Sequence, residues 1–220
     1  MARERTERPA PDPGSETTTA RAARASRTRG RILDAARRVL AEQGIAGFTT
    51  RRVAGIAEVS HGMVHYHFHD KRDLILALVV HARRDWVEPL EELVDGPGTA
   101  DERMRAVIDW IAQPATRDTL RVHLGLYVSA LDDDRIRERV AAEYARWRAP
   151  FTVLFRQLGD ERAQTFDAHA LGDAFATAAD GLVQQQVFDP ELPTDRILTA
   201  LYDRLVPGEG GQGAEDRNRR

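Results

Sequence analysis

The segment that most constrains the fold is residues 49–71, which reads TTRRVAGIAEVSHGMVHYHFHDK. A small apolar face at helical spacing is formed by Val53, Ala54 and Ala57. Ser60 follows it, and because serine is a preferred N-cap, the sequence predicts a second short helix over residues 61–67. Two short helices joined by a tight turn form a helix-turn-helix, whose second helix enters the major groove of DNA.

The flanking residues predict the remainder of a small helical domain. Before the segment, apolar residues repeat at helical spacing at Ile32, Leu33, Ala36, Val39 and Leu40. This pattern predicts a helix from about Arg27 to Gln43, ended by Gly44. After the segment, Phe68 supplies an apolar anchor, and Asp70 is expected to cap a longer helix that begins at Lys71.

Residues 27–75 resemble the N-terminal DNA-binding domain of TetR-family transcriptional regulators. The matching residues are, in order, Gly47-Phe48, Thr49-Thr50, Val53-Ala54, Ala57-Glu58-Val59-Ser60, Gly62-Met63-Val64-His65, Tyr66-His67-Phe68 and Lys71. An ordered match of this length is far more specific than a single short motif. The resemblance implies a sequence-specific DNA-binding regulator, usually a repressor, with no enzymatic activity, catalytic residue or cofactor.

Three positions depart from the family pattern. Glu58 stands where the family has its turn glycine, and a left-handed backbone there would cost about 1 kcal/mol of strain. Met63 replaces the usual threonine of the second helix, and His65 replaces the usual tyrosine. These changes concern which bases are read, because Met63 lacks a hydroxyl donor and offers an apolar contact to a thymine methyl.

The DNA contacts are expected at the start of the first short helix, along the second, and at the start of the following helix. The predicted residues are Thr49, Thr50, Arg51, Ser60, His61, Gly62, Met63, His65, Tyr66, His67 and Lys71. Charge supports this placement, since residues 1–72 contain 14 basic and 8 acidic residues, whereas the remainder contains 18 basic and 27 acidic residues. A basic end attracts phosphate, and an acidic body is repelled by it.

The histidines at 61, 65, 67 and 69 also admit a metal site, because His61 and His65 are four residues apart on one helical face. The corresponding alternative function is an all-helical metal-dependent hydrolase that uses these histidines with Asp70 or Asp73. No nucleophile-base signature or phosphate loop accompanies them, so we predict no metal site. Another alternative is an architectural DNA-binding protein that responds to no ligand.

The rest of the chain reads as helical throughout, which makes the predicted fold all-α. Helices are expected from Lys71 to about Asp95, kinked or split by Pro89, and then over Asp101–Ala112, Arg117–Leu131, Asp133–Gly159, Phe166–Phe188 and Thr194–Val206. The Arg117–Leu131 helix is apolar on most sides, which predicts a central, buried position. The predicted division is a disordered Arg-rich tail (1–26), a helix-turn-helix domain (27–72), a helical ligand-binding and dimerisation domain (73–206) and a second disordered tail (207–220).

At the end of the tail at residues 1–26 and the start of the next helix, Arg21, Arg24 and Arg27 could touch phosphate or the minor groove. A solvated leader with no dedicated role is the favoured interpretation. In the helical domain, eight side chains are candidates for a ligand cavity: Trp86, Trp110, His123, Tyr127, Trp147, Phe155, Phe175 and Gln184. Many such side chains simply belong to a core. The effector itself is an unknown small molecule.

Residues 117–206 are also similar to TetR members related to the choline-responsive betaine regulator. The similar segments are Tyr144 to Arg148, Asp180-Gly181-Leu182 and Asp189-Pro190-Glu191. The family resemblance implies a homodimer formed through the two C-terminal helices, bound to a palindromic double-stranded operator. The alanines Ala170, Ala174 and Ala178 would permit close helix approach in such an interface.

The composition excludes several classes of site. The chain contains no cysteine, which rules out disulfides, zinc-thiolate sites and thiol catalysis. No apolar run approaches the length of a bilayer span, and no secretory signal pattern opens the sequence, so a cytoplasmic protein without membrane attachment is expected.

Overall fold

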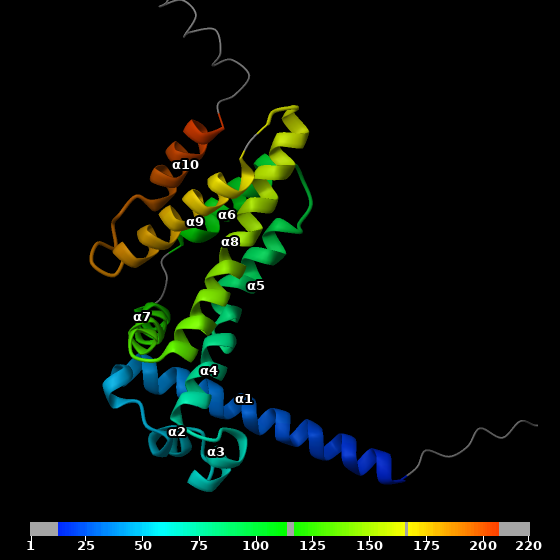
Figure 1. Ribbon diagram of the computed structural model, residues 1–220, viewed down its shortest axis with the longest axis vertical. Helices are drawn as coiled ribbons and strands as arrows, with labels where there is room; N and C mark the ends of the chain where they lie inside the picture. Colours follow the sequence, from blue (N-terminus) through cyan, green and yellow to red (C-terminus); the bar gives the residue numbers. More distant parts are fainter. Residues whose placement is uncertain (1–12, 114–116, 166, 207–220) are drawn as a thin grey trace, which may run out of the picture.

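The computed structural model describes residues 13–113, 117–165 and 167–206, and its regular elements in these ranges are all helices (Figure 1). They are α1 (Pro13–Gly47), α2 (Thr50–Ile56), α3 (His61–His67), α4 (Lys71–His81), α5 (Arg83–Val94), α6 (Ala100–Ala112), α7 (Arg117–Leu131), α8 (Asp134–Arg162), α9 (Ala168–Gln185) and α10 (Thr194–Leu205). The predicted all-α class is confirmed. The predicted tail at 207–220 lies outside the described residues, as does the predicted helix start at Phe166.

Helices α1 to α4 form the N-terminal domain around a continuous apolar core. The face of α1 that begins at Ile32 is buried, and the rings of Phe48 and Phe68 fill the space between it and the short helices. Val64 is the buried residue of α3, so this short helix is held by one apolar anchor while its other faces point outward.

The predicted caps at Ser60 and Asp70 are confirmed, and Thr49 caps α2. The Thr49 side chain accepts a hydrogen bond from the Arg52 backbone N–H at 3.3 Å, and Ser60 accepts one from Met63 N–H at 3.1 Å. The Asp70 carboxylate accepts one from Asp73 N–H at 2.8 Å. Each cap satisfies an amide that the first turn of a helix leaves without a partner, which fixes where α2, α3 and α4 begin.

Helix α1 begins much earlier than the sequence pattern indicates. It includes residues 13–26, which were predicted to be part of a disordered tail. After Gly14 this stretch contains no proline or glycine before Gly30, and it is rich in alanine and arginine, which favour helices without any apolar period. The predicted end is confirmed in position, because Gly44 adopts a non-helical backbone with φ of 64°.

The long helix predicted after Lys71 is split, but the break does not lie at Pro89. The two parts meet at Ala82, and Pro89 lies within α5. The distortion that proline causes falls on its N-terminal side, because its ring collides with the carbonyl four residues earlier. The break at Ala82 lies upstream of that carbonyl, so Pro89 does not cause it.

Helices α5, α6, α8, α9 and α10 enclose a second core, in which α8 runs along the length of the molecule (Figure 1). Helices α8 and α9 approach closely, because a Cβ added to Gly172 would lie 2.7 Å from the Thr152 backbone nitrogen. Helix α7 packs against α1 in the same manner, since a Cβ on Gly125 would lie 2.7 Å from Leu40 Cδ1. This contact joins the two domains.

The predicted central position of α7 is wrong in part. It packs on α1 and α8, but Val128 is 46% exposed and Leu131 is 78% exposed. Although α7 is apolar on most sides, the side with Val128 and Leu131 is therefore not buried within this chain. Among the described residues, none of the helices is both long and apolar enough to cross a membrane.

Candidate DNA interface and ligand cavity

Helix α3 presents an exposed face with unusually large side chains. Tyr66 is 73% exposed and Met63 is 39% exposed, although both could bury considerable apolar surface. Gly62 at the start of the helix is also exposed, so another backbone can approach there closely. Because Val64 alone anchors the helix, the remaining side chains are available to a partner.

Three side chains at the start of this face are linked to one another. His61 Nε2 lies 3.0 Å from Thr50 Oγ1 of α2 and 3.2 Å from His65 Nε2. His65 Nδ1 lies 3.2 Å from the His69 carbonyl oxygen. These contacts orient the two imidazoles at the junction of α2 and α3. In each contact between ring nitrogens, one nitrogen carries the proton and donates, and the other accepts.

His67 differs from the other histidines of α3 because it is half-buried. Burial lowers its pKa, and the nearby charge of Arg29 lowers it further. The His67 imidazole is therefore neutral around pH 7, and acidification charges it only below the range of an ordinary histidine. No group of three or more histidine or carboxylate side chains suited to a metal ion occurs within the described residues.

The turn before α3 contains the predicted left-handed residue. Glu58 has φ of 52°, so glutamate occupies the backbone conformation that glycine adopts most easily. The Arg31 guanidinium donates a hydrogen bond to the adjacent Ala57 carbonyl at 2.7 Å. This contact from α1 fixes the turn, and with it the angle at which α3 leaves the domain.

The remaining predicted DNA-binding side chains lie on the same exposed part of the domain. Thr49 and Arg51 are exposed at the first turn of α2, and Ser60 caps α3. Lys71 lies at the first turn of α4, with its Nζ 5.8 Å from the centre of the Phe48 ring. Because these side chains are exposed on one part of the domain, DNA can reach them, and their contact with DNA stays a prediction.

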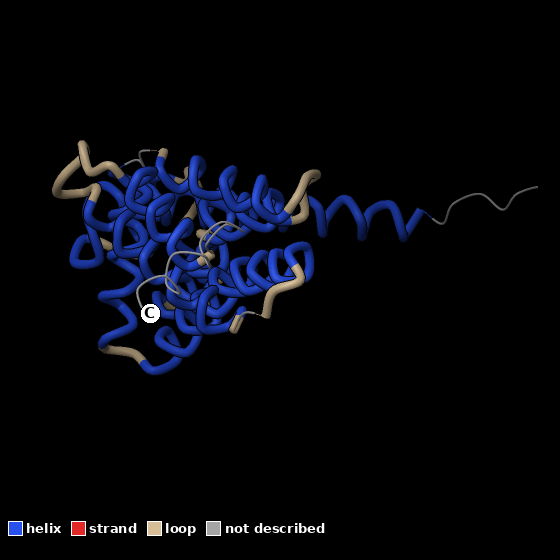
Figure 2. The backbone as a smooth tube through the Cα atoms, turned by 90° about the horizontal axis from the view of Figure 1, so that it is seen from above, coloured by secondary structure: helices blue, strands red, loops and turns tan. Residues whose placement is uncertain are grey.

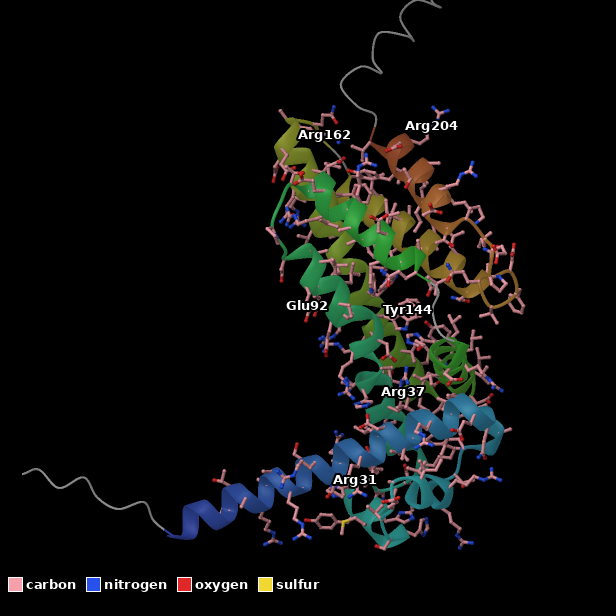
Figure 3. All side chains as sticks on the ribbon, turned by 180° about the vertical axis from the view of Figure 1, so that it is seen from behind. Arg31, Arg37, Glu92, Tyr144, Arg162 and Arg204 are labelled. Carbon is pink, nitrogen blue, oxygen red and sulfur yellow. The ribbon has the colours of Figure 1, made fainter. Side chains whose placement is uncertain are left out.

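The C-terminal domain contains a cavity of about 90 Å³ between α4, α5, α7, α8 and α9. Aromatic side chains form much of its wall: Trp86, Tyr127, Tyr144 and Trp147, with the imidazole of His123. Tyr144 lies near the middle of the molecule, between the two groups of helices that form its ends (Figure 3). The rings of Tyr127 and Tyr144 are 5.4 Å apart between centroids, and those of Trp86 and His123 are 5.3 Å apart.

Two carboxylates also line the cavity, and their surroundings differ. Glu143 lies beside Arg83, with Glu143 Oε2 3.4 Å from Arg83 Nε, so its charge has a counterpart. Asp180 accepts hydrogen bonds from Tyr144 Oη at 3.1 Å and from Gln184 Nε2 at 2.7 Å. Asp180 has no cationic neighbour at ion-pair distance among the described residues, and burial raises its pKa against the effect of these two hydrogen bonds.

The other polar groups of the wall are uncharged at neutral pH. Burial lowers the pKa of His123 to about 4, and burial raises the pKa of Tyr144 to about 12. Burial, followed by the charge of Asp180, raises the pKa of Tyr127 as well. Within the described residues, Trp86 Nε1 and His123 Nε2 are buried without a hydrogen-bond partner, as are Arg83 Nε and Glu143 Oε2, which face each other in the ion pair. The cavity thus combines one unneutralised acid with two polar atoms that a bound molecule could satisfy.

Five of the eight residues predicted to line a ligand cavity lie on its wall: Trp86, His123, Tyr127, Trp147 and Gln184. The other three do not. Trp110 lies behind the wall, with its ring centre 6.1 Å from that of Trp86, while Phe155 and Phe175 are fully buried in the core.

Four polar residues of the wall were missed as ligand candidates: Arg83, Glu143, Tyr144 and Asp180. The signal for Asp180 was available in the sequence, because it is an acidic residue on a helix whose neighbours are mostly alanine and other apolar residues. A single carboxylate in such a position requires a compensating partner or a function. Glu143 and Tyr144 gave a weaker signal, because they stand in a helix that is rich in charge.

Comparison with known families assigns both halves of the chain. Residues 32–78 match the family described as bacterial regulatory proteins of the tetR family, and residues 100–208 match the C-terminal domain of the BetI-type transcriptional repressors. The BetI regulator of Brucella suis (strain ATCC 23445 / NCTC 10510) is 26% identical over 180 residues, which cover 81% of this chain and 89% of that protein. The CymR regulator of Pseudomonas putida is 32% identical over 127 residues, covering 58% and 63% respectively.

Solved structures show the same architecture. A transcriptional regulator of Pseudomonas aeruginosa PAO1 superimposes with a TM-score of 0.71 at 22% identity, covering 87% of this chain and 93% of that one. A transcriptional regulator of Saccharomonospora viridis, solved in complex with choline, has a TM-score of 0.64 at 25% identity and covers 81% and 95%. The two family matches and the BetI relatives establish that the chain belongs to the TetR family of bacterial transcriptional regulators, which are not enzymes, and that its C-terminal domain is of the BetI type.

Proposed function

We propose that this regulator is a repressor that binds its operator through α3 and is released when a small organic cation enters the aromatic cavity. The observation that carries the choice of ligand is Asp180, a largely buried carboxylate without a cationic partner among the described residues, in a wall of aromatic rings. The faces of tryptophan and tyrosine attract cations, and a quaternary ammonium group suits such a cage.

The charge balance of the cavity favours a cation over an anion or a neutral ligand. Arg83 is engaged with Glu143, and His123 is uncharged at neutral pH, so neither adds a net positive charge to the cavity. Burying the ionised Asp180 costs free energy, which a bound cation would offset. The choline complex of the Saccharomonospora viridis regulator supports this class of ligand.

Release would follow from a change in the separation of two recognition helices. We propose a homodimer formed through α9 and α10, acting on a palindromic operator in the bacterial cytoplasm, with its two α3 helices about 34–36 Å apart in successive major grooves. Exposed Ala170 and Ala174 on α9 and the 39% exposed Ile197 on α10 support this surface. A ligand that prefers a different separation weakens DNA binding by the ratio of its affinities for the two states.

Tryptophan fluorescence tests the ligand directly, because all three tryptophans of the chain lie at or behind the cavity wall. We would titrate the purified protein with choline and, separately, with 3,3-dimethylbutan-1-ol, which has nearly the same shape without the charge. Saturable quenching or a spectral shift with choline at a concentration at least about 10-fold lower than with the alcohol is expected. Equal responses to both compounds would contradict a cation site, and no response to either would favour regulation without this class of ligand.

A further inference from the structure

The N-terminal part of α1 extends beyond the domain that the rest of the helix supports. We call residues 21–31 the arm. Burial along α1 begins at Ile32, and every arm residue is exposed or half-exposed. Figures 1 and 2 show this part of α1 projecting away from the helical body. At 1.5 Å per residue, the arm is about 15 Å long.

The arm carries a concentrated positive charge. It contains five arginines, and no acidic residue occurs between Glu16 and Asp34. Four of the arginines (Arg21, Arg24, Arg27 and Arg31) share one face, because their spacing of three or four residues follows the helical repeat. The fifth, Arg29, lies on another face with its guanidinium 5.0 Å from the centre of the Phe68 ring.

This charge is not neutralised within the described residues. No carboxylate lies at ion-pair distance from Arg21, Arg24 or Arg27 there, whereas Arg37 and Arg38, farther along the same helix, both pair with acids. Like charges at these spacings repel one another and weaken a helix. A helical arm without apolar packing and with an unneutralised stripe is therefore suited to an anionic partner.

The arginine stripe is continuous with the start of the recognition helix. Arg24, Arg27, Thr28 and Arg31 line one side of a surface hollow, and Val59, Ser60 and Met63 line the other. Ser60 and Met63 belong to the cap and first turn of α3, the part of a recognition helix that contacts base edges. Any duplex seated on α3 therefore brings its backbone toward the arginines of the arm.

We propose that the arm is a second DNA-binding element, in which Arg21, Arg24 and Arg27 bind backbone phosphates of the duplex flanking the half-site that α3 reads. Arg31 has a different task, because it already holds the Ala57 carbonyl of the turn. Phosphate contacts of this kind carry no sequence information and add affinity that depends steeply on salt. The arm thus contributes affinity, while α3 selects the site.

The test compares the unaltered protein with the triple variant Arg21→Ala, Arg24→Ala and Arg27→Ala. Fluorescence anisotropy would measure binding to a 40-base-pair duplex that contains the footprinted site from the chain's own upstream region, and to the same duplex trimmed to the footprint core. On the long duplex at about 0.1 M salt, the variant is expected to bind about 10- to 100-fold more weakly, with a salt slope lower by about 2 to 3. On the trimmed duplex the difference should shrink.

Two control variants make the result specific. Arg121→Ala, Arg139→Ala and Arg156→Ala together remove three exposed arginines of the C-terminal domain, and they should leave affinity and slope unchanged. Replacing Arg21, Arg24 and Arg27 with lysine keeps the charge and should retain most of the affinity. Equal affinity and slope for the alanine triple variant and the unaltered protein would overturn the proposal. Failure of the unaltered protein to distinguish its site from a scrambled duplex would instead count against site-specific reading by α3.

Discussion

Arg37 of α1 and Asp85 of α5 form a two-pronged ion pair between the DNA-binding domain and the wall of the ligand cavity. Arg37 Nε and Nη2 lie 3.1 and 3.0 Å from Asp85 Oδ2, and Nη2 also donates a hydrogen bond to Thr119 Oγ1 of α7 at 3.1 Å. Asp85 precedes Trp86 in sequence, and its charge acts on His123, so the pair joins directly to two cavity residues. Arg37 is part of α1 and lies below Tyr144 in Figure 3.

Replacing Arg37 with methionine should weaken communication between the two domains. The variant keeps an apolar stem but loses the donors to Asp85 and Thr119, so the free energy of unfolding should fall by about 1–2 kcal/mol. The ratio of operator affinities without and with effector should move toward one, because coupling requires differential contacts between the two states. Operator titrations with and without effector measure that ratio. Arg38→Met, at an exposed neighbour, is the control, and an unchanged ratio in Arg37→Met would remove this pair from the coupling route.

Replacing Glu58 with glycine should stabilise the protein by about 1 kcal/mol, because it removes the strain of φ 52° on a side-chain-bearing residue. Urea unfolding followed by circular dichroism measures the change. Ala163→Gly is a matched comparison at the other non-glycine residue with positive φ in the described part of the chain, where φ is 50° at the end of α8. Both should stabilise, and a loss of stability in Glu58→Gly would mean that the glutamate side chain contributes more than its backbone costs.

Tyr66→Ala should reduce operator affinity by about 10-fold or more while leaving the melting temperature nearly unchanged. The tyrosine is 73% exposed, so its removal leaves no cavity in the core, whereas a ring placed at DNA contributes stacking and phosphate contacts. Leu131→Ala, which removes a 78% exposed apolar side chain on α7, should leave DNA affinity unaltered. Retained operator affinity in Tyr66→Ala would contradict the assignment of α3 as the reading helix.

Asp180→Asn should abolish cation binding and stabilise the protein without ligand. Asparagine still accepts the hydrogen bonds from Tyr144 and Gln184, but it carries no charge that burial penalises. Cation affinity should fall about 10-fold or more, as for removal of one partner of a buried charge pair. Calorimetry and thermal unfolding measure the two effects, with Asp109→Asn on the exposed side of α6 as control. Unchanged cation affinity would exclude Asp180 as the counter-ion.

The pH dependence of this site has a definite sign. Burial raises the pKa of Asp180 in the folded state, so folding favours its protonated form. Its contribution to stability is complete below the pKa of the unfolded state and is lost as pH rises through the folded pKa. The stabilising effect of Asp180→Asn should therefore be largest near neutral pH and vanish in acid. Cation binding should also weaken as the pH falls, because acidification protonates the Asp180 carboxylate.

Ala174→Arg should convert a dimer to a monomer and weaken operator binding. The alanine is exposed on α9, so a long charged side chain fits the single chain but not a closely packed helix interface. Light scattering coupled to gel filtration gives the mass, and operator titration gives the affinity. Ala149→Arg, at an exposed alanine of α8, is the control. A dimer that persists in Ala174→Arg would place the interface elsewhere.

The sequence predicted the DNA-binding domain in detail because its signals are local. Thr49, Ser60 and Asp70 define helix starts by hydrogen bonds within three residues, and Glu58 marks the left-handed turn by its position between two helices. The helical conformation of residues 13–26, which include the first part of the arm, was missed for a physical reason. This stretch has no apolar period, and only alanine and arginine propensity together with the packed part of α1 indicate a helix there.

The cavity was predicted less completely because it depends on contacts between distant segments. Aromatic residues of α5, α7 and α8 could be named from their helical faces, but the sequence could not distinguish the wall from the core, as Phe155 and Phe175 show. The pairing of Tyr144 with Asp180 joins residues 36 positions apart, and it follows from the close contact of α8 and α9 at Gly172.

We propose that a cation in the aromatic cavity controls the DNA-reading helix. Fluorescence anisotropy tests it most directly, with the protein on its own upstream intergenic DNA, on a scrambled duplex, and with choline added to each. Preference for the upstream DNA by about 10³-fold or more, reduced by choline but not by 3,3-dimethylbutan-1-ol, is the predicted result. Equal, salt-sensitive binding to both duplexes that neither compound changes would contradict it.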